Sequence, residues 1–427
     1  MNKFFIYSTK YCDGRMLDCQ RIHNYLLING WVQVKKVSKA NLVIIGTCSY
    51  SKLEEDSSVD FIKYFNRKKC DSALMVVTGC LSKVNPSRLK NIQGLVLLSP
   101  TDLERLDEIV KPHTPLSKIK EPNIVVPTQV INNELFKRMF VLRNYLTRSI
   151  GLPELYNQVK SIVHYILLTK SYINPLLVCK GNDYFCLRIS KGCLGRCSYC
   201  AIRFSTGNLI SREISEIVND FRSGLKSGRK TFYVTAEDAG SYGQDTGTDI
   251  VKLLKEIFAC GLGYDYKIIL TNLNAHWFLK YYAELERMLM EHQYKIFYVQ
   301  IPIQSASNRI LKLMNRPYNI EEVKMCLLSL QSKIPGLNIA TDIIVGFPGE
   351  TEEDFNMTKD LISRINFSFV DVFSYEDRPN TAASLMGGKV SREVINARKL
   401  ELSRIQNKRT KTTAIVKKIK EIAKDLS

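Results

Sequence analysis

The stretch Gly192-Cys193-Leu194-Gly195-Arg196-Cys197-Ser198-Tyr199-Cys200 places three cysteines within eight residues. This C-x3-C-x2-C spacing directly follows an apolar run at 185–189 that predicts a β-strand. Three thiolates this close can bind different irons of one [4Fe–4S] cluster if the loop wraps around it, which Gly192 and Gly195 permit. The fourth iron would then stay open to a small molecule. Zinc is the alternative, but structural zinc sites usually carry paired knuckles, and we find no second knuckle in the sequence.

The strand before this loop is the first of a series that alternates with helical patterns. Strands are predicted at 185–189, 231–235, 267–271, 296–301, 337–345 and 369–373. Helical patterns follow most of them, at 214–223, 249–259, 308–313 and 352–364. The alternation predicts a (β/α)6-type partial TIM barrel over residues 183–390, with its loops gathered at one end.

The N-terminal part, residues 1–100, also alternates strands and helices. Strands are predicted at 3–7, 41–46, 73–78 and 95–98, and helices at 17–28 and 58–67. This α/β pattern predicts a doubly wound parallel-sheet domain.

Cys12, Cys48 and Cys80 each follow one of the first three of these strands. The carboxyl ends of parallel strands lie side by side, so the three thiols should meet at one edge of the sheet. A second three-cysteine cluster is therefore predicted, and three unrelated buried cysteines are the alternative.

Two further segments complete the predicted organisation. Residues 101–182 contain a proline-punctuated linker and a helical insertion at 132–173, with helices over 132–148 and 153–172. Residues 391–427 form a basic helical tail.

Composition bounds the class of protein. Of 427 residues, 45% are hydrophobic and 24% charged, which is typical of a soluble globular protein. No apolar run reaches the roughly 18–20 residues of a membrane-spanning helix, and the N-terminus resembles a strand more than a signal peptide. We therefore expect a cytoplasmic protein without membrane contact, whose 12 cysteines stay reduced. The net charge of +19 favours contact with RNA or DNA, although the Lys, Ile and Asn bias of an AT-rich genome is an alternative.

The cysteine loop resembles the radical S-adenosylmethionine superfamily, and the whole chain is similar to its methylthiotransferases over most of residues 1–100 and 183–400. The stretches that carry the resemblance, in chain order, are 78–80, 192–200 with Gly207, 235–238, 301–308, 314–318, 341–351 and 373–382. Residues 193–195 and 236–243 resemble the type that acts on threonylcarbamoyl-adenosine beside the tRNA anticodon.

The resemblance implies a reaction that uses two [4Fe–4S] clusters and two molecules of S-adenosylmethionine per turnover. One molecule methylates a sulfide at the auxiliary cluster of Cys12, Cys48 and Cys80. The other is reductively cleaved at the cluster of Cys193, Cys197 and Cys200, and its 5′-deoxyadenosyl radical removes a substrate hydrogen. A low-potential electron donor, such as flavodoxin or ferredoxin, and a sulfur donor are implied partners. No catalytic residue is predicted beyond the cluster ligands.

Residues at barrel strand ends are the predicted contacts of S-adenosylmethionine. They are Tyr199, Glu237, Asp238, Gln304, Ser305, Asp342, Gly346 and Phe347. For each carboxylate, a helix N-cap or a loop salt bridge is the structural alternative. Gly346 is also expected to shape a turn.

The chain departs from the family pattern on the expected substrate side. Tyr11 stands where a glycine is usual, and 268–275 lacks the usual Arg and Pro. After Val390 we expect the basic tail instead of the family's small nucleic-acid-binding β-barrel, with the insertion at 132–173 as a possible replacement. Two substrates are therefore predicted: tRNA, at C2 of a modified adenosine, or a residue in a protein or peptide.

Overall fold

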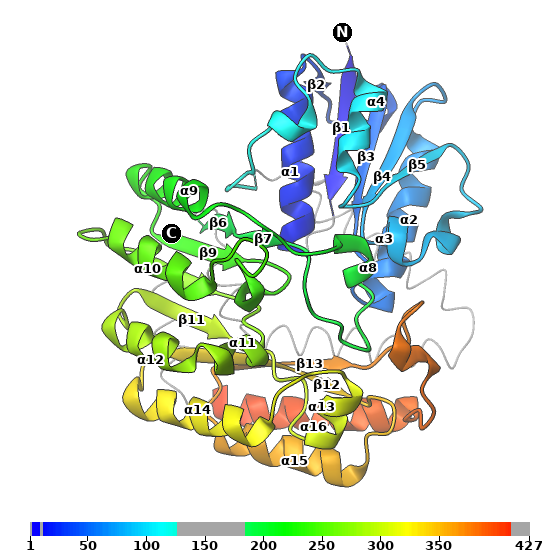
Figure 1. Ribbon diagram of the computed structural model, residues 1–427. Coiled ribbons are helices and arrows are strands. Elements are labelled where there is room, and N and C mark those ends of the chain that lie inside the picture. The colour runs from blue at the N-terminus through cyan, green and yellow to red at the C-terminus, as the bar shows by residue number, and fades with distance from the viewer. Residues whose placement is uncertain (1, 9–11, 126–183, 411–427) are drawn as a thin grey trace.

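The computed structural model describes residues 2–8, 12–125 and 184–410. The predicted helices at 132–148 and 153–172, Tyr11 and the tail beyond Thr410 lie outside these ranges. The described chain is organised around two parallel sheets, each covered by helices (Figure 1).

The N-terminal sheet has five parallel strands in the order β2-β1-β3-β4-β5. The strands are β1 Lys3–Ser8, β2 Val32–Gln33, β3 Leu42–Thr47, β4 Leu74–Gly79 and β5 Leu95–Leu98. Ile44 and Val76 pack with helix α1 (Asp13–Ile28) on one face, whereas Ile45 and Val77 pack with α2 (Lys52–Lys68) on the other. This is the strand order of flavodoxin-like sheets, so the predicted doubly wound fold is confirmed.

The segment after β5 extends this N-terminal layer. It contains η3 (Leu103–Arg105), α4 (Leu106–Val110) and η4 (Leu116–Lys118). Their leucines and Ile119 join the apolar cluster of α1, and Arg21 of α1 donates to the carbonyl oxygens of Leu116 and Ile119 at 2.9 and 3.0 Å. The residues from 101 to 119, which the sequence pattern assigned to a linker, therefore pack on the first sheet.

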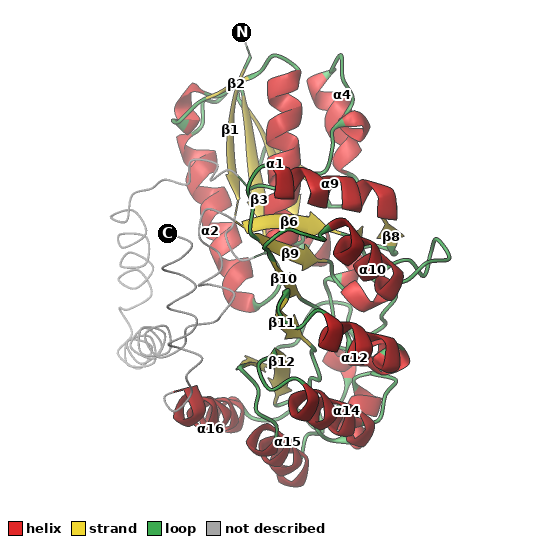
Figure 2. Ribbon diagram, turned by 90° about the vertical axis from the view of Figure 1, so that its left-hand side faces the viewer, coloured by secondary structure: helices red, strands yellow, loops and turns green. Residues whose placement is uncertain are grey.

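The second sheet has six parallel strands in chain order, from β6 to β13. They are β6 Tyr184–Arg188, β9 Thr231–Thr235, β10 Lys267–Leu270, β11 Ile296–Gln300, β12 Asn338–Val345 and β13 Phe369–Ser374. Five helices line one face of this sheet (Figure 2): α9 Ile214–Lys226, α10 Ile250–Cys260, α12 Tyr282–Glu291, α14 Ile320–Lys333 and α15 Glu352–Arg364. The predicted (β/α)6 partial barrel is confirmed.

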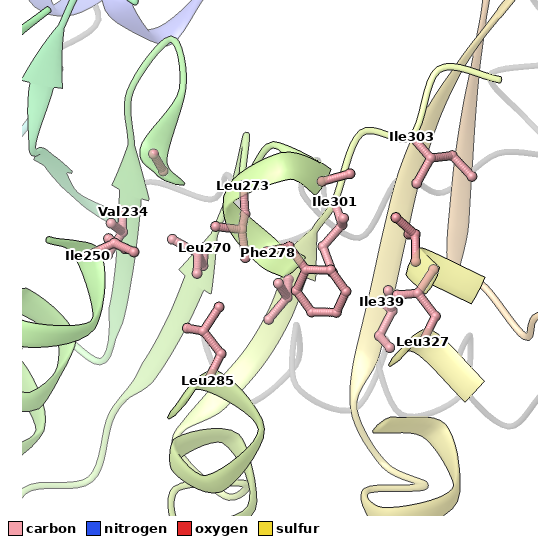
Figure 3. Close-up of a cluster of buried hydrophobic side chains, with 14 of the residues drawn as sticks. Val234, Ile250, Leu270, Leu273, Phe278, Leu285, Ile301, Ile303, Leu327 and Ile339 are labelled. Atoms are coloured by element: carbon pink, nitrogen blue, oxygen red, sulfur yellow. The ribbon is translucent and has the colours of Figure 1, made fainter. Parts of the chain in front are cut away.

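The spacing of apolar residues explains how these helices pack on the sheet. In α10, Ile250, Leu253, Leu254 and Ile257 recur at helical spacing and are all buried. They pack with strand residues such as Val234 and with Phe278 in the core of Figure 3. Each such buried side chain contributes about 1.5–3 kcal/mol relative to an exposed one.

Short elements occupy the loops. They are η1 Val37–Lys39, α3 Leu81–Val84, η2 Pro86–Leu89, β7 Ser190–Lys191, α8 Arg203–Thr206, β8 Ile210–Ser211, η5 Ala239–Ser241, α11 Ala275–Lys280, α13 Asn308–Leu313 and η6 Ala382–Leu385. Most follow the carboxyl ends of strands, where sites of α/β proteins form.

The inner face of the barrel sheet is covered in part by the N-terminal domain. Leu17 of α1 is fully buried against Cys186, Tyr233, Ile269 and Tyr298, which point inward from four neighbouring strands. Helix α1 thereby brings its N-terminus, and Cys12 with it, to the inside of the barrel.

Helix α16 (Arg392–Thr410) packs beside β13 at the edge of the sheet. Ile395 occupies the space beside Gly346, where a Cβ would lie 2.2 Å from Ile395 Cγ1. Arg398 forms a buried ion pair with Glu350 at 2.7 Å. Within the described ranges, no helix combines the length and the apolar character needed to cross a membrane.

Candidate iron–sulfur and S-adenosylmethionine sites

The loop with Cys193, Cys197 and Cys200 follows β7 and is shaped by two glycines. Gly192 has φ +74°, and a Cβ there would lie 1.9 Å from the carbonyl oxygen of Asn208. A Cβ at Gly195 would lie 3.1 Å from Cys193 Sγ and 3.8 Å from Cys197 Sγ. Two of the thiols therefore gather around Gly195, whose N–H also donates to Cys193 Sγ at 3.1 Å.

Electrostatics disfavour free thiolates in this loop. Burial, the charge of Asp238 and the neighbouring thiols raise the pKa of Cys193 to about 12. Burial also raises the pKa of Cys200, although the backbone N–H groups of Ile202 and Arg203 lower it. A bound metal would deprotonate such thiols, whereas without one they stay protonated at neutral pH.

Arg316, to which the sequence had assigned no role, contacts this loop. Its side chain is 8% exposed, and Nη1 lies 3.6 Å from Cys197 Sγ. Nη2 donates to the carbonyl oxygen of Pro302 at 2.6 Å, and Nε donates to the hydroxyl of Tyr318 at 3.4 Å. The guanidinium is thus fixed where it stabilises a thiolate at Cys197.

Cys12, Cys48 and Cys80 lie at the carboxyl ends of β1, β3 and β4, which are adjacent strands. Cys48 and Cys80 directly follow Thr47 and Gly79, which are register partners. Gly79 has φ +102°, and a Cβ there would lie 2.2 Å from the Thr47 carbonyl oxygen. The structure therefore brings the second cysteine set to one edge of the sheet, as the strand positions predicted.

The second set is also electrostatically coupled. Burial, followed by the charges of Cys12 and Cys80, raises the pKa of Cys48 well above its ordinary value. Burial raises the pKa of Cys80 to about 11, against the lowering influence of Arg15. All described cysteines are free thiols, so both sets are chemically available as ligands.

Both donor sets fit a four-iron cluster. Each set offers three thiols on loops or strand ends, and each thiolate would bind a different iron of the cluster. Within the described ranges, no three His, Cys, Asp or Glu side chains converge closely enough to hold a single metal ion. A four-iron cluster does not require that convergence, because its ligands are spread around a cube.

The two cysteine sets face each other across the domain boundary. Cys80 packs in one buried cluster with Ala201, the residue after Cys200, and with Phe204 of α8. Tyr50, two residues after Cys48, interacts electrostatically with Cys200, and its ring lies 5.4 Å from that of Phe373 in β13. Tyr50 is nevertheless 54% exposed, so part of its ring is open to solvent.

Among the predicted S-adenosylmethionine contacts, Tyr199 and Phe347 lie close together. Their rings meet edge to face at 6.4 Å, and Phe347 is fully buried against Tyr375 as well. Gly346, with φ +76°, adjoins α16 and donates its N–H to Glu350. This arrangement favours the turn-shaping interpretation of Gly346.

Asp238 and Glu237 have protein partners. Asp238 is the N-cap of η5 and accepts from Gly240 N at 3.1 Å and from Trp277 Nε1 at 3.1 Å. Burial raises the pKa of its carboxyl group despite the charge of Arg316. Glu237 forms an ion pair with Arg15 of the N-terminal domain at 3.2 Å. Asp238 is thus a helix N-cap and Glu237 a salt-bridge partner, which are the two structural alternatives given for these carboxylates. Their contacts with S-adenosylmethionine stay predictions.

Gln304 and Ser305 follow β11. Gln304 has φ +63° and is 8% exposed, and its Oε1 has no hydrogen-bond partner among the described residues. Ser305 is buried, and its hydroxyl accepts from Ser307 N at 3.2 Å. Among the predicted contacts of S-adenosylmethionine, Gln304 thus keeps a hydrogen-bond acceptor, Oε1, that is available to a ligand.

Asp342 faces the inside of the barrel beside Asp371, its register partner on β13. Gln300 Nε2 donates to Asp342 Oδ1 at 2.7 Å. Burial and the charge of Asp371 raise the pKa of Asp342 to about 7, and burial raises the pKa of Asp371 to about 6 despite Lys399 of α16. Tyr50 interacts electrostatically with both carboxylates, so the three side chains lie near one another.

Comparison with known families gives two matches. Residues 187–362 match the radical SAM superfamily, and residues 5–98 match the uncharacterized protein family UPF0004. The first match contains the Cys193 loop and most barrel strands. The second contains Cys12, Cys48 and Cys80.

Similar curated proteins include both tRNA- and protein-modifying relatives. A probable threonylcarbamoyladenosine tRNA methylthiotransferase of Pyrococcus horikoshii is 40% identical over 204 residues, which cover 48% of this chain and 47% of the relative. The ribosomal protein uS12 methylthiotransferase RimO of Chlamydia caviae is 26% identical over 406 residues, or 93% of this chain and 77% of the relative. The match therefore spans about half the length of the first relatives, such as the one from P. horikoshii.

Solved structures share the fold. The radical S-adenosylmethionine methyltransferase TsrM from Kitasatospora setae, with cobalamin and a [4Fe–4S] cluster bound, superposes with a TM-score of 0.58 at 12% identity, covering 90% of this chain and 77% of that one. The cobalamin-dependent radical enzyme OxsB gives a TM-score of 0.53 at 12% identity, covering 95% and 56%. At this identity the likeness concerns the fold alone.

The barrel and the Cys193 loop thus define a radical S-adenosylmethionine protein. Together with the UPF0004 match, these relatives support the radical SAM methylthiotransferase family that the sequence predicted.

Proposed function

We propose that this protein inserts a CH3–S group in place of hydrogen at an unactivated carbon, and that its substrate is a tRNA. The proposed position is C2 of a threonylcarbamoyl-type adenosine near the anticodon. The observation that carries the proposal is the placement of two three-cysteine sets at facing strand ends, joined by the packing of Cys80 on Ala201.

In this proposal Cys193, Cys197 and Cys200 hold one [4Fe–4S] cluster, and Cys12, Cys48 and Cys80 hold the other. When bound, the two clusters supply reductive cleavage of S-adenosylmethionine on one side and the sulfur to be transferred on the other. A low-potential electron donor and a sulfur donor are required partners.

The protein's own residues position these groups. Arg316 places a buried positive charge 3.6 Å from Cys197 Sγ. Helix α1, seated on the inner face of the barrel through Leu17, covers part of that face and keeps water from it. Tyr50 interacts with Cys200, Asp342 and Asp371, so in this proposal the substrate carbon would lie near these residues.

A tRNA substrate is supported by charge and by the named relatives. The net charge of +19 favours a polyanion, and the relative from P. horikoshii is named for the tRNA reaction. Binding should weaken steeply with salt, because each phosphate contact releases counterions. Binding that does not depend on salt would count against tRNA.

A protein residue is the second candidate substrate. The observation that favours it is the similarity to the ribosomal protein uS12 methylthiotransferase, which extends over 93% of this chain. Both candidates require the same replacement of a C–H hydrogen by a CH3–S group, so the barrel and the two cysteine sets do not distinguish them.

Mass spectrometry distinguishes the two. Total tRNA nucleosides and ribosomal-protein peptides are compared between cells with and without the gene. The expected result is a gene-dependent gain of one CH3–S group on a threonylcarbamoyl-adenosine. The gain on a peptide instead would establish the second candidate.

Complementation with variants provides the controls. A chain with Cys193, Cys197 and Cys200 replaced by alanine should not restore the modification. The matched variant Cys326→Ala, which changes a cysteine on α14 outside both sets, should restore it. Full modification by the triple variant would refute the proposed chemistry.

A further inference from the structure

Arg15 is a buried cation beside the second cysteine set. It lies in the first turn of α1, three residues after Cys12, and is 3% exposed. Its Nη1 lies 3.0 Å from Asp18 Oδ2, and its Nη2 lies 3.2 Å from Glu237 Oε1. The second contact joins the N-terminal domain to the barrel loop after β9.

Two thiols of this set lie near the guanidinium. Cys12 and Cys80 both interact electrostatically with Arg15. A Cβ on Gly14 would lie 4.0 Å from Cys12 Sγ and 3.8 Å from Glu237 Oε1, so the thiol and the carboxylate lie on the same side of α1.

Arg15 retains hydrogen-bonding capacity that its neighbours do not use. Within the described ranges, its Nε and the Oε2 of Glu237 are buried without a hydrogen-bond partner, and its Nη1 has only the ion-pair contact with Asp18. A buried unsatisfied donor costs about 1–3 kcal/mol. In contrast, both terminal nitrogens of nearby Arg188 are bonded, Nη1 to Asp18 and to the Gly14 carbonyl, and Nη2 to Glu121. Arg188 therefore anchors α1, although its Nε is also unpaired among the described residues. What distinguishes Arg15 is that its guanidinium, with a free Nε, interacts with Cys12 and Cys80.

We propose that Arg15 is a positioning residue for the cluster at Cys12, Cys48 and Cys80, whose negative charge it compensates, and that Glu237 from the barrel opposes this effect. The proposal rests on the proposed function in one respect, namely that these three cysteines hold a cluster.

Charge determines the direction of the effect. A cluster with three thiolate ligands is negatively charged, and reduction adds one more electron. A nearby cation stabilises the reduced form more than the oxidised form, which raises the reduction potential. Removing Arg15 should lower the potential, and neutralising Glu237 should raise it.

The test is a redox titration followed by electron paramagnetic resonance. The full chain carries alanine at Cys193, Cys197 and Cys200, so that only the second cluster contributes. In this background Arg15→Met is expected to lower the ratio of reduced to oxidised cluster at least tenfold at a fixed potential, which is about 59 mV for one electron. Glu237→Gln is expected to shift the ratio in the opposite direction.

Two control variants keep the test specific. Arg21→Met removes a guanidinium from the same helix that bonds only to the carbonyl oxygens of Leu116 and Ile119, and it should leave the potential unchanged. Arg15→Lys keeps the charge and should retain most of the potential. If the Arg15→Met variant loads no cluster, the reduction potentials of the Arg15→Lys and Glu237→Gln variants still test the proposal.

Equal potentials for the Arg15→Met and Arg21→Met variants would overturn the proposal. Shifts of the same sign for Arg15→Met and Glu237→Gln would overturn it too, because a steric effect has no reason to follow charge. Absence of iron from the parent triple variant would instead contradict the proposed function, so the two failures are distinguishable.

Discussion

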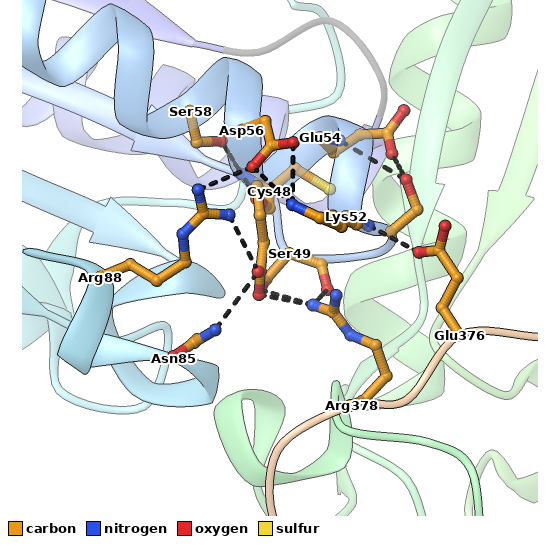
Figure 4. Close-up of polar contacts among 12 residues, drawn as sticks. Cys48, Ser49, Lys52, Glu54, Asp56, Ser58, Asn85, Arg88, Glu376 and Arg378 are labelled. Carbon is orange, nitrogen blue, oxygen red and sulfur yellow. Dashed lines mark hydrogen bonds and ion pairs between the residues drawn. The ribbon is translucent and has the colours of Figure 1, made fainter. Parts of the chain in front are cut away.

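Arg378 Nη2 lies 2.7 Å from the carbonyl oxygen of Ser49, the residue after Cys48. The same nitrogen contacts Ser49 Oγ at 3.0 Å and Glu55 Oε1 at 2.5 Å (Figure 4). Arg378 belongs to the barrel loop after β13, whereas Ser49 and Glu55 belong to the N-terminal domain. One buried guanidinium therefore connects the loop after Cys48 in the first domain to the loop after the last strand of the second domain.

Replacing Arg378 by Met should destabilise the protein strongly. Arg378 and Glu55 are 7% and 3% exposed, and removing one partner of a buried ion pair costs about 3–5 kcal/mol. The expected result is a clearly lower midpoint of thermal unfolding in the cluster-loaded chain. Arg88 pairs with the same Glu55 at 3.4 Å, but its side chain is 28% exposed. Arg88→Met should cost less, and equal losses for the two variants would contradict the role given to burial.

The two cysteine sets should load iron independently. Alanine at Cys193, Cys197 and Cys200, or at Cys12, Cys48 and Cys80, is expected to remove about four irons per chain, because in the proposed function each set holds one four-iron cluster. Iron and sulfide analysis of anaerobically reconstituted protein measures this. Cys326→Ala should leave the iron content unchanged. If either triple variant retained all iron, the corresponding set would not be a ligand set.

Much of this fold could be predicted because its strands are short apolar runs with clear ends. The strand at 231–235 has the predicted bounds, and the cysteine sets follow from spacing and strand position alone. Helix starts were less visible. Helix α1 begins at Asp13, four residues before the predicted start, because its N-cap is Cys12, whose side chain makes no capping hydrogen bond. Helix α2 begins at Lys52, after the N-cap Ser51, where the pattern predicted 58.

The residues that connect the sites could not be predicted from local sequence. Arg316 lies 119 residues from its partner Cys197, and Arg15 lies 222 residues from Glu237. Spacing in sequence indicates ligand sets that share one loop or one sheet edge. It carries no information about which arginine is folded onto which thiol, because that depends on how two domains pack.

Arg316→Met should impair the loop with Cys193, Cys197 and Cys200 in particular. The substitution removes the positive charge beside Cys197 and leaves the Pro302 carbonyl without its 2.6 Å donor, at about 1–3 kcal/mol for each unsatisfied group. We expect slower reductive cleavage of S-adenosylmethionine, measured as 5′-deoxyadenosine released under dithionite. Arg309→Met removes an exposed arginine on α13, seven residues before Arg316, and serves as the control. Cleavage at the unaltered rate in Arg316→Met would contradict this role.

Tyr50→Ala should separate substrate use from cofactor cleavage. Its exposed ring follows Cys48 by two residues, interacts with Cys200 and contacts Phe373, so its loss should weaken the proposed substrate positioning. We expect a several-fold lower kcat/KM for methylthiolation with 5′-deoxyadenosine formation maintained, which appears as uncoupled turnover. Tyr50→Phe should stay close to the parent if the ring matters. Equal losses in both readouts would instead indicate damage to the radical site.

Asp342→Asn should change how stability depends on pH. Burial and Asp371 raise the pKa of Asp342 to about 7 in the folded protein, whereas an unfolded aspartate titrates near 3.9. The fold therefore favours the protonated carboxyl, and this contribution is complete below about pH 4 and is lost as the pH rises to about 7. At about 1.36 kcal/mol per unit, the loss amounts to about 4 kcal/mol at most. An asparagine does not ionise, so the midpoint of thermal unfolding of Asp342→Asn should rise relative to the parent between pH 5 and pH 8. Asp265→Asn, at an exposed position, is the matched control. A difference for Asp342→Asn that does not change with pH would show that the Asp342 carboxyl is already ionised in the fold.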